Sequence, residues 1–349
     1  MIKQLMFVGI IASLLFTGCA KKVQVKALKP AEVGEMASKK KVAITSFKND
    51  TTGLSSKIEA QIAKHKLDQK RYFTVLSRKD IKKVLDEQKL QSSELMDEKT
   101  ASKIGNLLGA QALINGEVTS DGKNDKYVVQ KTRCLEYYKD GGCARHQKYN
   151  VTCRTADVSV SASINIIDME TASLIYADNI TKTYSGDSCK DGMLNLGLMS
   201  LGSDNSKILS IGQAKTNLTN IIANEFVYKL TPHYVYFNVT LLDSVEFEIT
   251  DRQVEEFEVA LEYINAGRFD KAEKIMSNLN DSLNGKSYVV MYDLGVIKEA
   301  RGNFDEAKKL YDFADDTSLK PIDEINSAVI RINKLIDERN QARAQIKKS

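Results

Sequence analysis

The sequence contains no tryptophan and only three histidines among its 349 residues. The histidines, His65, His146 and His233, lie far apart in the chain, so a metal centre or a histidine-based catalyst has few residues to draw on. No nucleophile with a nearby base, no phosphate-binding loop and no cluster of metal ligands is evident in the sequence. We therefore expect a protein that is not an enzyme, with no cofactor and no metal site.

A large excess of one charge is also missing. The chain has 50 Lys and Arg residues against 46 Asp and Glu residues, which gives a formal net charge of +4 at pH 7. This small charge, and the lack of a basic stripe interleaved with aromatic residues, argue against nucleic acid as a partner. The length is sufficient for two domains that each bury a hydrophobic core.

The N-terminus has the pattern of an export signal. Lys3 precedes an apolar run over residues 5–16 that is too short to cross a bilayer, so residues 1–18 are predicted to be a signal peptide. Small residues precede Cys19 in a pattern that resembles the bacterial lipobox, which implies that Cys19 is lipidated. Ala20 rather than Asp follows it, which in the lipobox pattern implies the outer membrane. The alternative is a cleaved secretory signal with an incidental cysteine.

The next two hundred residues alternate between strand-like and helix-like patterns. Residues 97–120 contain one such step: an apolar helical face, then Gly109, where a left-handed residue ends a helix, and then an extended run. Within that run, Gly116 allows another backbone to approach closely. Strands are also expected near residues 41–47, 71–78, 158–166, 174–183 and 235–249, and helices near 54–62, 81–85 and 211–226. The predicted fold class is α+β, a mixed β-sheet with packed helices.

Four blocks of the sequence resemble the CsgG family of outer-membrane lipoproteins. They are VAITSFKN, FTVLSRKDIKKVLDEQKL, TASKIGNLLGAQALINGEVT and the hairpin around SINIIDMETASLIYA, and the resemblance covers about residues 41–229 and the lipobox. It implies an anticodon-binding-like α/β domain that faces the periplasm from an outer-membrane anchor. The founding member is the curli secretion channel, the related lipoprotein LpoB activates a peptidoglycan synthase, and others assist flagellar or surface-fibre assembly. The family has no catalytic residues to transfer to this chain.

Two insertions, residues 120–155 and 185–203, lie where the channel member has membrane-spanning hairpins. A lipid-facing strand needs about 9–11 residues with an apolar outer face. Residues 120–155 instead have charged side chains at both even and odd positions, so neither face of a strand would be apolar. We therefore expect a polar, cross-linked loop and favour a periplasmic scaffold over a pore subunit. The alternative is a stapled surface insertion with no partner. The candidates for contacting a partner from this loop are Tyr127, Tyr137 and Tyr138.

Four cysteines fall in or beside the two insertions: Cys134, Cys143, Cys153 and Cys189. An even number of cysteines in an exported protein predicts two disulfides, and the sequence leaves all three pairings open. The alternative is a zinc site, which the long spacings between these cysteines do not favour.

Two similar segments near the C-terminus, residues 266–276 and 301–311, are 35 residues apart. Their small and aromatic positions resemble those of a tetratricopeptide repeat, which predicts a small all-α domain over residues 251–349. Such a domain either forms a peptide-binding groove or is a structural helical cap on the first domain, and we favour the cap. The candidates for contacting a peptide in the groove are Phe269, Phe304 and Tyr311.

We therefore expect four parts: a signal peptide (1–18), a lipidated tether (19–40), a CsgG-like domain (41–250) and a tetratricopeptide-like helical domain (251–349). The expected function is an assembly, secretion or scaffolding component of a cell-envelope or surface-fibre system. The alternative is an LpoB-like accessory lipoprotein that regulates a periplasmic cell-wall synthase or a flagellar component. The expected partners are the membrane, through the lipid on Cys19, other envelope proteins and further copies of the chain in a homo-oligomer, but not nucleic acid.

Overall fold

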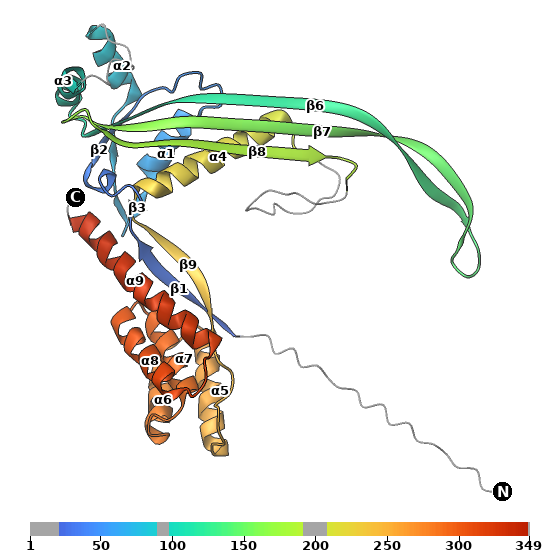
Figure 1. Ribbon diagram of the computed structural model, residues 1–349, viewed down its shortest axis with the longest axis vertical. Coiled ribbons are helices and arrows are strands. Elements are labelled where there is room, and N and C mark those ends of the chain that lie inside the picture. The colour runs from blue at the N-terminus through green and yellow to red at the C-terminus, as the bar shows by residue number, and fades with distance from the viewer. Residues whose placement is uncertain (1–20, 89–97, 191–207, 348–349) are drawn as a thin grey trace. The chain divides into compact units, whose positions relative to one another are not determined.

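Figure 1 shows the computed structural model, which describes residues 21–88, 98–190 and 208–347. Cys19 lies outside these residues, so its lipidation stays a prediction. The chain divides into two compact units. We call them the sheet unit, residues 30–233 with 341–349, and the helical unit, residues 1–29 with 234–340.

The sheet unit is built on a five-stranded sheet with the strand order β5-β2-β6-β7-β8. Its strands are β2 (Lys41–Ile44), β5 (Thr74–Val75), β6 (Ala112–Tyr137), β7 (Cys143–Asp168) and β8 (Leu174–Asp187). β2 runs parallel to β5 and β6, whereas β7 is antiparallel to both β6 and β8. The helices of this unit are α1 (Leu54–Lys64), α2 (Arg78–Glu87), α3 (Glu98–Leu108) and α4 (Ile211–Leu230). The predicted mixed sheet with packed helices is confirmed.

Helices cover both faces of this sheet, because its central strands have apolar side chains on both faces. Ile114 and Ile166 lie opposite each other on the face that α4 covers, and both are fully buried. Leu113 and Ile167 have the opposite parity, and they pack in a separate cluster with Ile104 of α3. Figure 1 shows α1 and α4 together on one side of the long strands. Continuous apolar runs are typical of strands that are buried on both faces.

The step from α3 to β6 follows the sequence pattern. Gly109 has φ +62°, the left-handed conformation predicted for the end of this helix. Gly116 lies where a Cβ atom would be 2.5 Å from the carbonyl oxygen of Ser163 and 3.1 Å from Phe47, which confirms the predicted close approach. Both glycines are therefore required by geometry, the first for its φ angle and the second for space.

The predicted tether begins as a strand in the structure. β1 (Lys22–Lys29) pairs with β9 (His233–Thr240) in a separate two-stranded sheet of the helical unit. Val23, Val25 and Ala27 of β1 are buried and alternate with exposed residues. The prediction of a flexible tether over residues 19–40 was therefore wrong for β1, because its alternating apolar side chains enter a core.

The end of the predicted first domain also differs. β9 pairs with β1 rather than extending the five-stranded sheet, and residues 241–250 are not in a strand. Val245 and Ile249 still pack against the core of the helical unit. The alternating pattern of residues 235–249 thus predicted the burial of these two side chains correctly. The expectation that the segment belongs to the first domain and its sheet was wrong.

Five helices form the rest of the helical unit and confirm the expected C-terminal run of helices. They are α5 (Asp251–Asn265), α6 (Phe269–Ser282), α7 (Tyr288–Ala300), α8 (Phe304–Thr317) and α9 (Asp323–Lys347), of which residues 341–347 are assigned to the sheet unit. α5 packs against α6, α6 against α7 and α7 against α8. Gly267 and Gly302 follow α5 and α7 with φ of +71° and +80°. The helices lie where the repeat predicted them, and the tetratricopeptide assignment itself stays a prediction.

A buried polar network joins three of these helices. The carboxylate of Glu299, which is fully buried, accepts two hydrogen bonds of 2.8 Å from the guanidinium of Arg331 and one of 2.5 Å from the hydroxyl of Tyr311. Burial and the neighbouring Glu299 carboxylate raise the pKa of Tyr311 well above its usual value. A buried carboxylate is tolerated in this way only when its hydrogen bonds are supplied by fixed partners.

Gly295 of α7 provides a test of the helix packing. An added Cβ atom there would lie 2.5 Å from the ring of Tyr311, which is fully buried and cannot swing away. We expect Gly295→Ala to destabilise the helical unit by about 1–3 kcal/mol through overpacking. The matched control is Gly212→Ala in α4, where no atom lies within 4 Å, and it should stabilise by about 0.5–1 kcal/mol. Thermal and urea unfolding followed by circular dichroism measures both, and equal effects would contradict the packing.

A second test concerns Asp178 of β8, whose carboxylate accepts hydrogen bonds from Lys229 Nζ at 2.7 Å and from Tyr176 at 2.8 Å. Burial raises the pKa of Asp178, but the hydrogen bonds from Lys229 and Tyr176 outweigh it, so the pKa is lowered. A lowered folded-state pKa adds stability above the unfolded-state pKa, and this stability is lost as the pH falls through the folded-state pKa.

We therefore expect Asp178→Asn to lower the free energy of unfolding at pH 7 by about 0.5–1.5 kcal/mol, and the difference to shrink below about pH 4. Chemical unfolding across that pH range measures it. The control is Asp125→Asn, because the Lys123–Asp125 pair has the same 2.7 Å distance but is largely exposed and should contribute nothing measurable. A pH-independent loss in the Asp178 variant would contradict the assignment.

Candidate functional site

The longest projecting element of the sheet unit is a hairpin made by β6 and β7 (Figure 1). The two strands pair from Ala112↔Asp168 outward to Tyr137↔Cys143, whereas the pairing of β8 with β7 ends at Thr155↔Asp187. We call residues 126–154, which lie beyond this last pair, the arm. The prediction of a loop over residues 120–155 was wrong, because the ladder that begins in the core continues through the polar residues.

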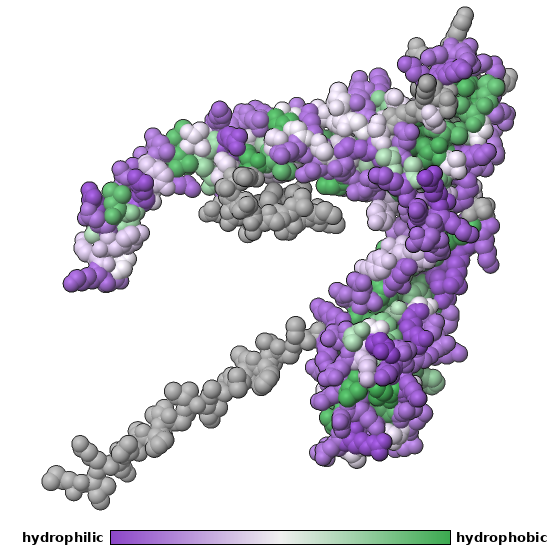
Figure 2. Space-filling view, turned by 180° about the vertical axis from the view of Figure 1, so that it is seen from behind, coloured by the Kyte–Doolittle hydropathy of each residue, from purple (hydrophilic) through white to green (hydrophobic). Residues whose placement is uncertain are grey.

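Neither face of the arm is continuously apolar. Lys126, Val128 and Lys148 lie on the face with even residue numbers, and Tyr127 and Lys131 lie on the other. Figure 2 shows hydrophilic surface along the arm, interrupted by smaller hydrophobic patches. The arm therefore lacks the continuous apolar outer face that a lipid-facing strand needs, as the charge pattern of the sequence indicates.

Two disulfides fix this hairpin. Cys134 and Cys143 are joined across the two strands near the tip, with a Cα–Cα distance of 5.7 Å. Cys153 near the base of the arm is joined to Cys189, just after β8, with a Cα–Cα distance of 5.5 Å. Both predicted disulfides are present, and the structure selects one of the three pairings that the sequence left open.

Tyr127 joins the base of the arm to the end of β8. Its hydroxyl donates to the carboxylate of Asp187, with O–O distances of 2.7 and 2.9 Å. The backbone N–H of Cys189 and this hydroxyl both lower the pKa of Asp187, and the same hydrogen bond raises the pKa of Tyr127. Tyr127 was predicted to contact a partner, but here it has a partner within the chain and positions the arm. Asp187 was not predicted, since nothing in the sequence pairs it with a residue 60 positions away.

The other predicted contact residues divide into exposed and buried sets. Tyr137 and Tyr138 at the tip are 70% and 62% exposed, so they are available to a partner. Phe304 and Tyr311 are 2% and 0% exposed, so the prediction that they contact a peptide was wrong. They belong to the core because the aromatic positions of a helical repeat pack between its helices. Phe269 is half-buried against the same core.

The surface that would form a peptide groove in the helical unit, the alternative to a structural cap, is filled by the chain itself. β1 packs against α5 and α7, and its side chains Val23, Val25 and Ala27 belong to the same core as Ala260 and Val290. Only two helical hairpins precede α9, fewer than the three repeats that such arrays usually need, so the strands supply the missing apolar cover. This supports the interpretation of the helices as a structural domain.

The arm has an excess of positive charge, which our inspection of the sequence missed. Residues 126–154 contain seven Lys and Arg side chains but only two acidic ones, Glu136 and Asp140. Among the described residues only one of these seven, Arg145, forms an ion pair, with Glu136 at 2.7 Å. Arg133 instead donates to Gln147 and lies 5.4 Å from the ring centre of Tyr149. A count over this window alone would have found the excess charge.

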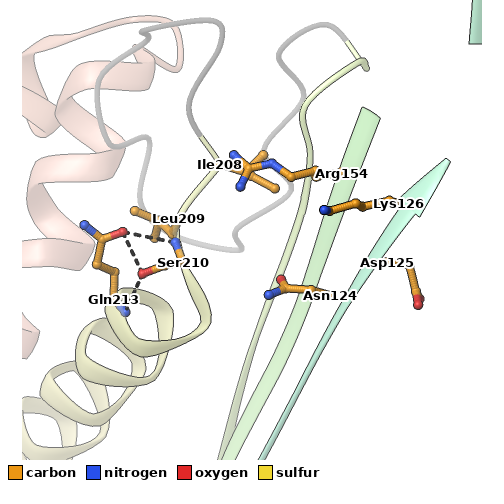
Figure 3. A pocket seen from close by; sticks show the side chains of 8 residues that line it. All are labelled: Asn124, Asp125, Lys126, Arg154, Ile208, Leu209, Ser210 and Gln213. Atoms are coloured by element: carbon orange, nitrogen blue, oxygen red, sulfur yellow. Dashed lines mark hydrogen bonds between the residues drawn. The ribbon is translucent and has the colours of Figure 1, made fainter. Parts of the chain in front are cut away.

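A shallow cavity of about 290 Å³ lies where the arm meets the start of α4 (Figure 3). Asn124, Lys126 and Arg154 border it from the strands. Ser210 and Gln213 border it from α4, and they form a capping box in which each side chain accepts from the backbone N–H of the other. The capping box satisfies the polar groups of Ser210 and Gln213, and the strands add the amide of Asn124 and the two cations to the lining of the cavity.

No group of three His, Cys, Asp or Glu side chains that could hold a metal ion occurs within the described residues. His146 is exposed in the arm, whereas His65 and His233 come near each other. His65 Nε2 donates to the carbonyl of Pro232, and His233 Nδ1 donates to that of Thr231. Burial lowers the pKa of His65. No helix in the described ranges is long and apolar enough to cross a membrane.

The chain was compared with families of known proteins and with curated proteins. None of the curated proteins compared with the chain matches it. The family described as "Curli production assembly/transport component CsgG" matches residues 24–208, which include most of β1, the whole five-stranded sheet and the arm. Because this match spans more than half of the 349 residues, the chain belongs to the CsgG family.

Proposed function

We propose that this protein is an outer-membrane-anchored, periplasm-facing lipoprotein that acts as an assembly, secretion or scaffolding component of a cell-envelope or surface-fibre system. Membership of the CsgG family is the observation that supports a role in assembly or transport. The lipobox-like sequence before Cys19 supports the anchor. We propose two domains that correspond to the two units, with β1 as part of the helical one; the two-unit division supports this.

The arm is the surface by which this component contacts its partners. A polar hairpin has no core of its own, so two disulfides and the Tyr127–Asp187 hydrogen bond are needed to hold its shape. Tyr137 and Tyr138 add exposed aromatic area at the fixed tip. Rigid aromatic side chains bind at low entropic cost, which makes them the anchors of many protein interfaces.

The second candidate function is that of an LpoB-like accessory lipoprotein that binds and regulates a periplasmic cell-wall synthase or a flagellar component. Two observations favour it. The arm is charged on both faces, and most of the helical unit, α5 to α9, lies beyond the matched residues. An additional rigid unit of this kind suits a protein that spaces or orients another protein.

The lipid anchor is tested directly by mass spectrometry of the protein purified from cell envelopes. We expect the mature chain to begin at Cys19 with the added mass of its acyl chains, and Cys19→Ala to leave the outer-membrane fraction. Cys134→Ser with Cys143→Ser is the matched control, since it also removes cysteine but leaves membrane association unchanged. An intact mass that begins at any other residue, or an unmodified Cys19, would refute the anchor.

The arm is tested by crosslinking in the native envelope followed by identification of the attached proteins. We expect Tyr137→Ala with Tyr138→Ala to reduce recovery of the partner at least about tenfold, because exposed aromatic residues at a fixed tip act as interface anchors. Tyr236→Ala is the control, because Tyr236 is 60% exposed but lies on β9. Recovery of a cell-wall synthase would support the accessory function, and undiminished recovery by the double variant would exclude the tip as the contact.

A further inference from the structure

The helical unit has an acidic surface that its own packing does not use. Residues 243–262 contain eight Asp and Glu side chains and a single Arg. Four of the acidic residues recur at i, i+4, i+7 and i+11 of α5, so they share one exposed face of the helix. We call this set the acidic stripe: Asp251, Glu255, Glu258 and Glu262.

None of the four carboxylates of the acidic stripe forms an ion pair within the described parts of the chain. The nearby pair Arg252–Glu256, at 3.0 Å, lies on a different side of α5. Like charges one turn apart on a helix face repel each other, so the acidic stripe costs the helix stability rather than adding to it. A surface of this kind gains most from a cationic partner.

The arm presents a cationic counterpart. Lys126 and Arg154 are directly opposite in the β6–β7 register, on the same exposed face, and Lys148 follows farther along it. None of the three forms an ion pair with any described residue. Like charges directly opposite on neighbouring strands are destabilising, so this face too lacks the counter-charge that would neutralise it.

The two surfaces match in length as well as in sign. Six residues of extended strand separate the Lys126 position from the Thr132–Lys148 pair, which is about 20 Å. The eleven steps from Asp251 to Glu262 span about 17 Å of helix. Each surface is a row of exposed side chains on a regular element, and the two rows have similar lengths.

We propose that the even-numbered face of the arm of one copy of this chain docks on the acidic stripe of a second copy. The contact joins two different surfaces, so each copy retains one free arm and one free acidic stripe after docking. Contacts of this kind continue from copy to copy and close into a ring or extend as a filament. This proposal does not depend on the proposed secretion or scaffolding function, since it concerns only how copies of the chain meet.

The physical character of the contact follows from its exposure. Solvent-exposed charges are screened over about 8 Å at physiological ionic strength, so docking weakens steeply as salt is added. Charge complementarity of this kind contributes mainly to the association rate and to partner choice. The exposed Val128, 61% accessible, lies between the cations on the same face and supplies apolar contact.

The test uses zero-length carbodiimide crosslinking of the full-length lipoprotein in detergent, with ¹⁴N- and ¹⁵N-labelled copies mixed. This reagent joins a lysine amine directly to a carboxylate. We expect mixed-isotope peptides that link Lys126 or Lys148 to Glu255 or Glu258. Their yield should fall at least about tenfold between about 50 mM and about 500 mM salt.

Charge exchange makes the test independent of folding defects. Glu255→Lys with Glu258→Lys, and Lys126→Glu with Lys148→Glu, should each abolish self-association in analytical ultracentrifugation, because the first neutralises the acidic stripe and the second turns the charge of the arm face negative. Mixing the two variants should restore association between them, since the unchanged arm of the first variant meets the unchanged acidic stripe of the second. The control, Asp315→Lys with Asp316→Lys, changes the charge equally at exposed positions of α8 and should associate as the parent does.

Three results would overturn the proposal. Links confined to a single isotope would mean that the arm docks within its own chain. Failure of the mixed variants to associate would mean that the two surfaces do not meet. Binding of the parent to vesicles of anionic lipid, lost in the Lys126/Lys148 variant and accompanied by no link between copies, would assign the arm to a membrane surface instead.

Discussion

The antiparallel pairing of β6 with β7 is the constraint on which the sheet unit depends. Ile114 and Ile166 are opposite each other at the core end, and the same register places Lys126 opposite Arg154 in the arm. Because side chains alternate with a period of two, a slip by one residue would expose the core residues and turn the arm cations to the other face. The hydrophobic core therefore determines which charged residues share a surface more than ten residues away.

The helical unit has too few helical repeats to complete a hydrophobic core from its helices alone. Two helical hairpins leave one side of α5 and α7 uncovered, and β1 covers it with Val23, Val25 and Ala27. The Glu299–Arg331 pair adds a fixed polar contact between α7 and α9, since a buried carboxylate must keep its donors. A groove for peptides and a core sufficient for stability compete for the same surface, and here the core occupies it.

Features that depend on neighbouring residues were predicted correctly from the sequence, whereas strand pairings that depend on distant residues were not. Gly109 and Gly116 were predicted from their neighbours, and the two disulfides from cysteine number and compartment. The strand β1 was missed although Val23, Val25 and Ala27 alternate, because its partner β9 lies some two hundred residues away. The outer half of the β6–β7 ladder was missed because its residues are polar. The strands pair there because they continue a register that begins in the core. Phe304 and Tyr311 were assigned to a groove because an aromatic residue in a repeat signals burial and binding equally well.

The net charge of +4 shows why a sum over the whole chain is a weak guide to partners. The arm has five more cationic than acidic residues and the segment 243–262 has seven more acidic than cationic ones, so two strong opposite surfaces nearly cancel in the total. Each surface is repulsive within itself, as the Lys126–Arg154 register pair and the i, i+4 spacing of Asp251 and Glu255 show. Neither arrangement favours folding of the unit that contains it. Rows of like charges on rigid elements destabilise the unit that contains them. They are better explained by an oppositely charged partner outside that unit than by the fold of the unit itself.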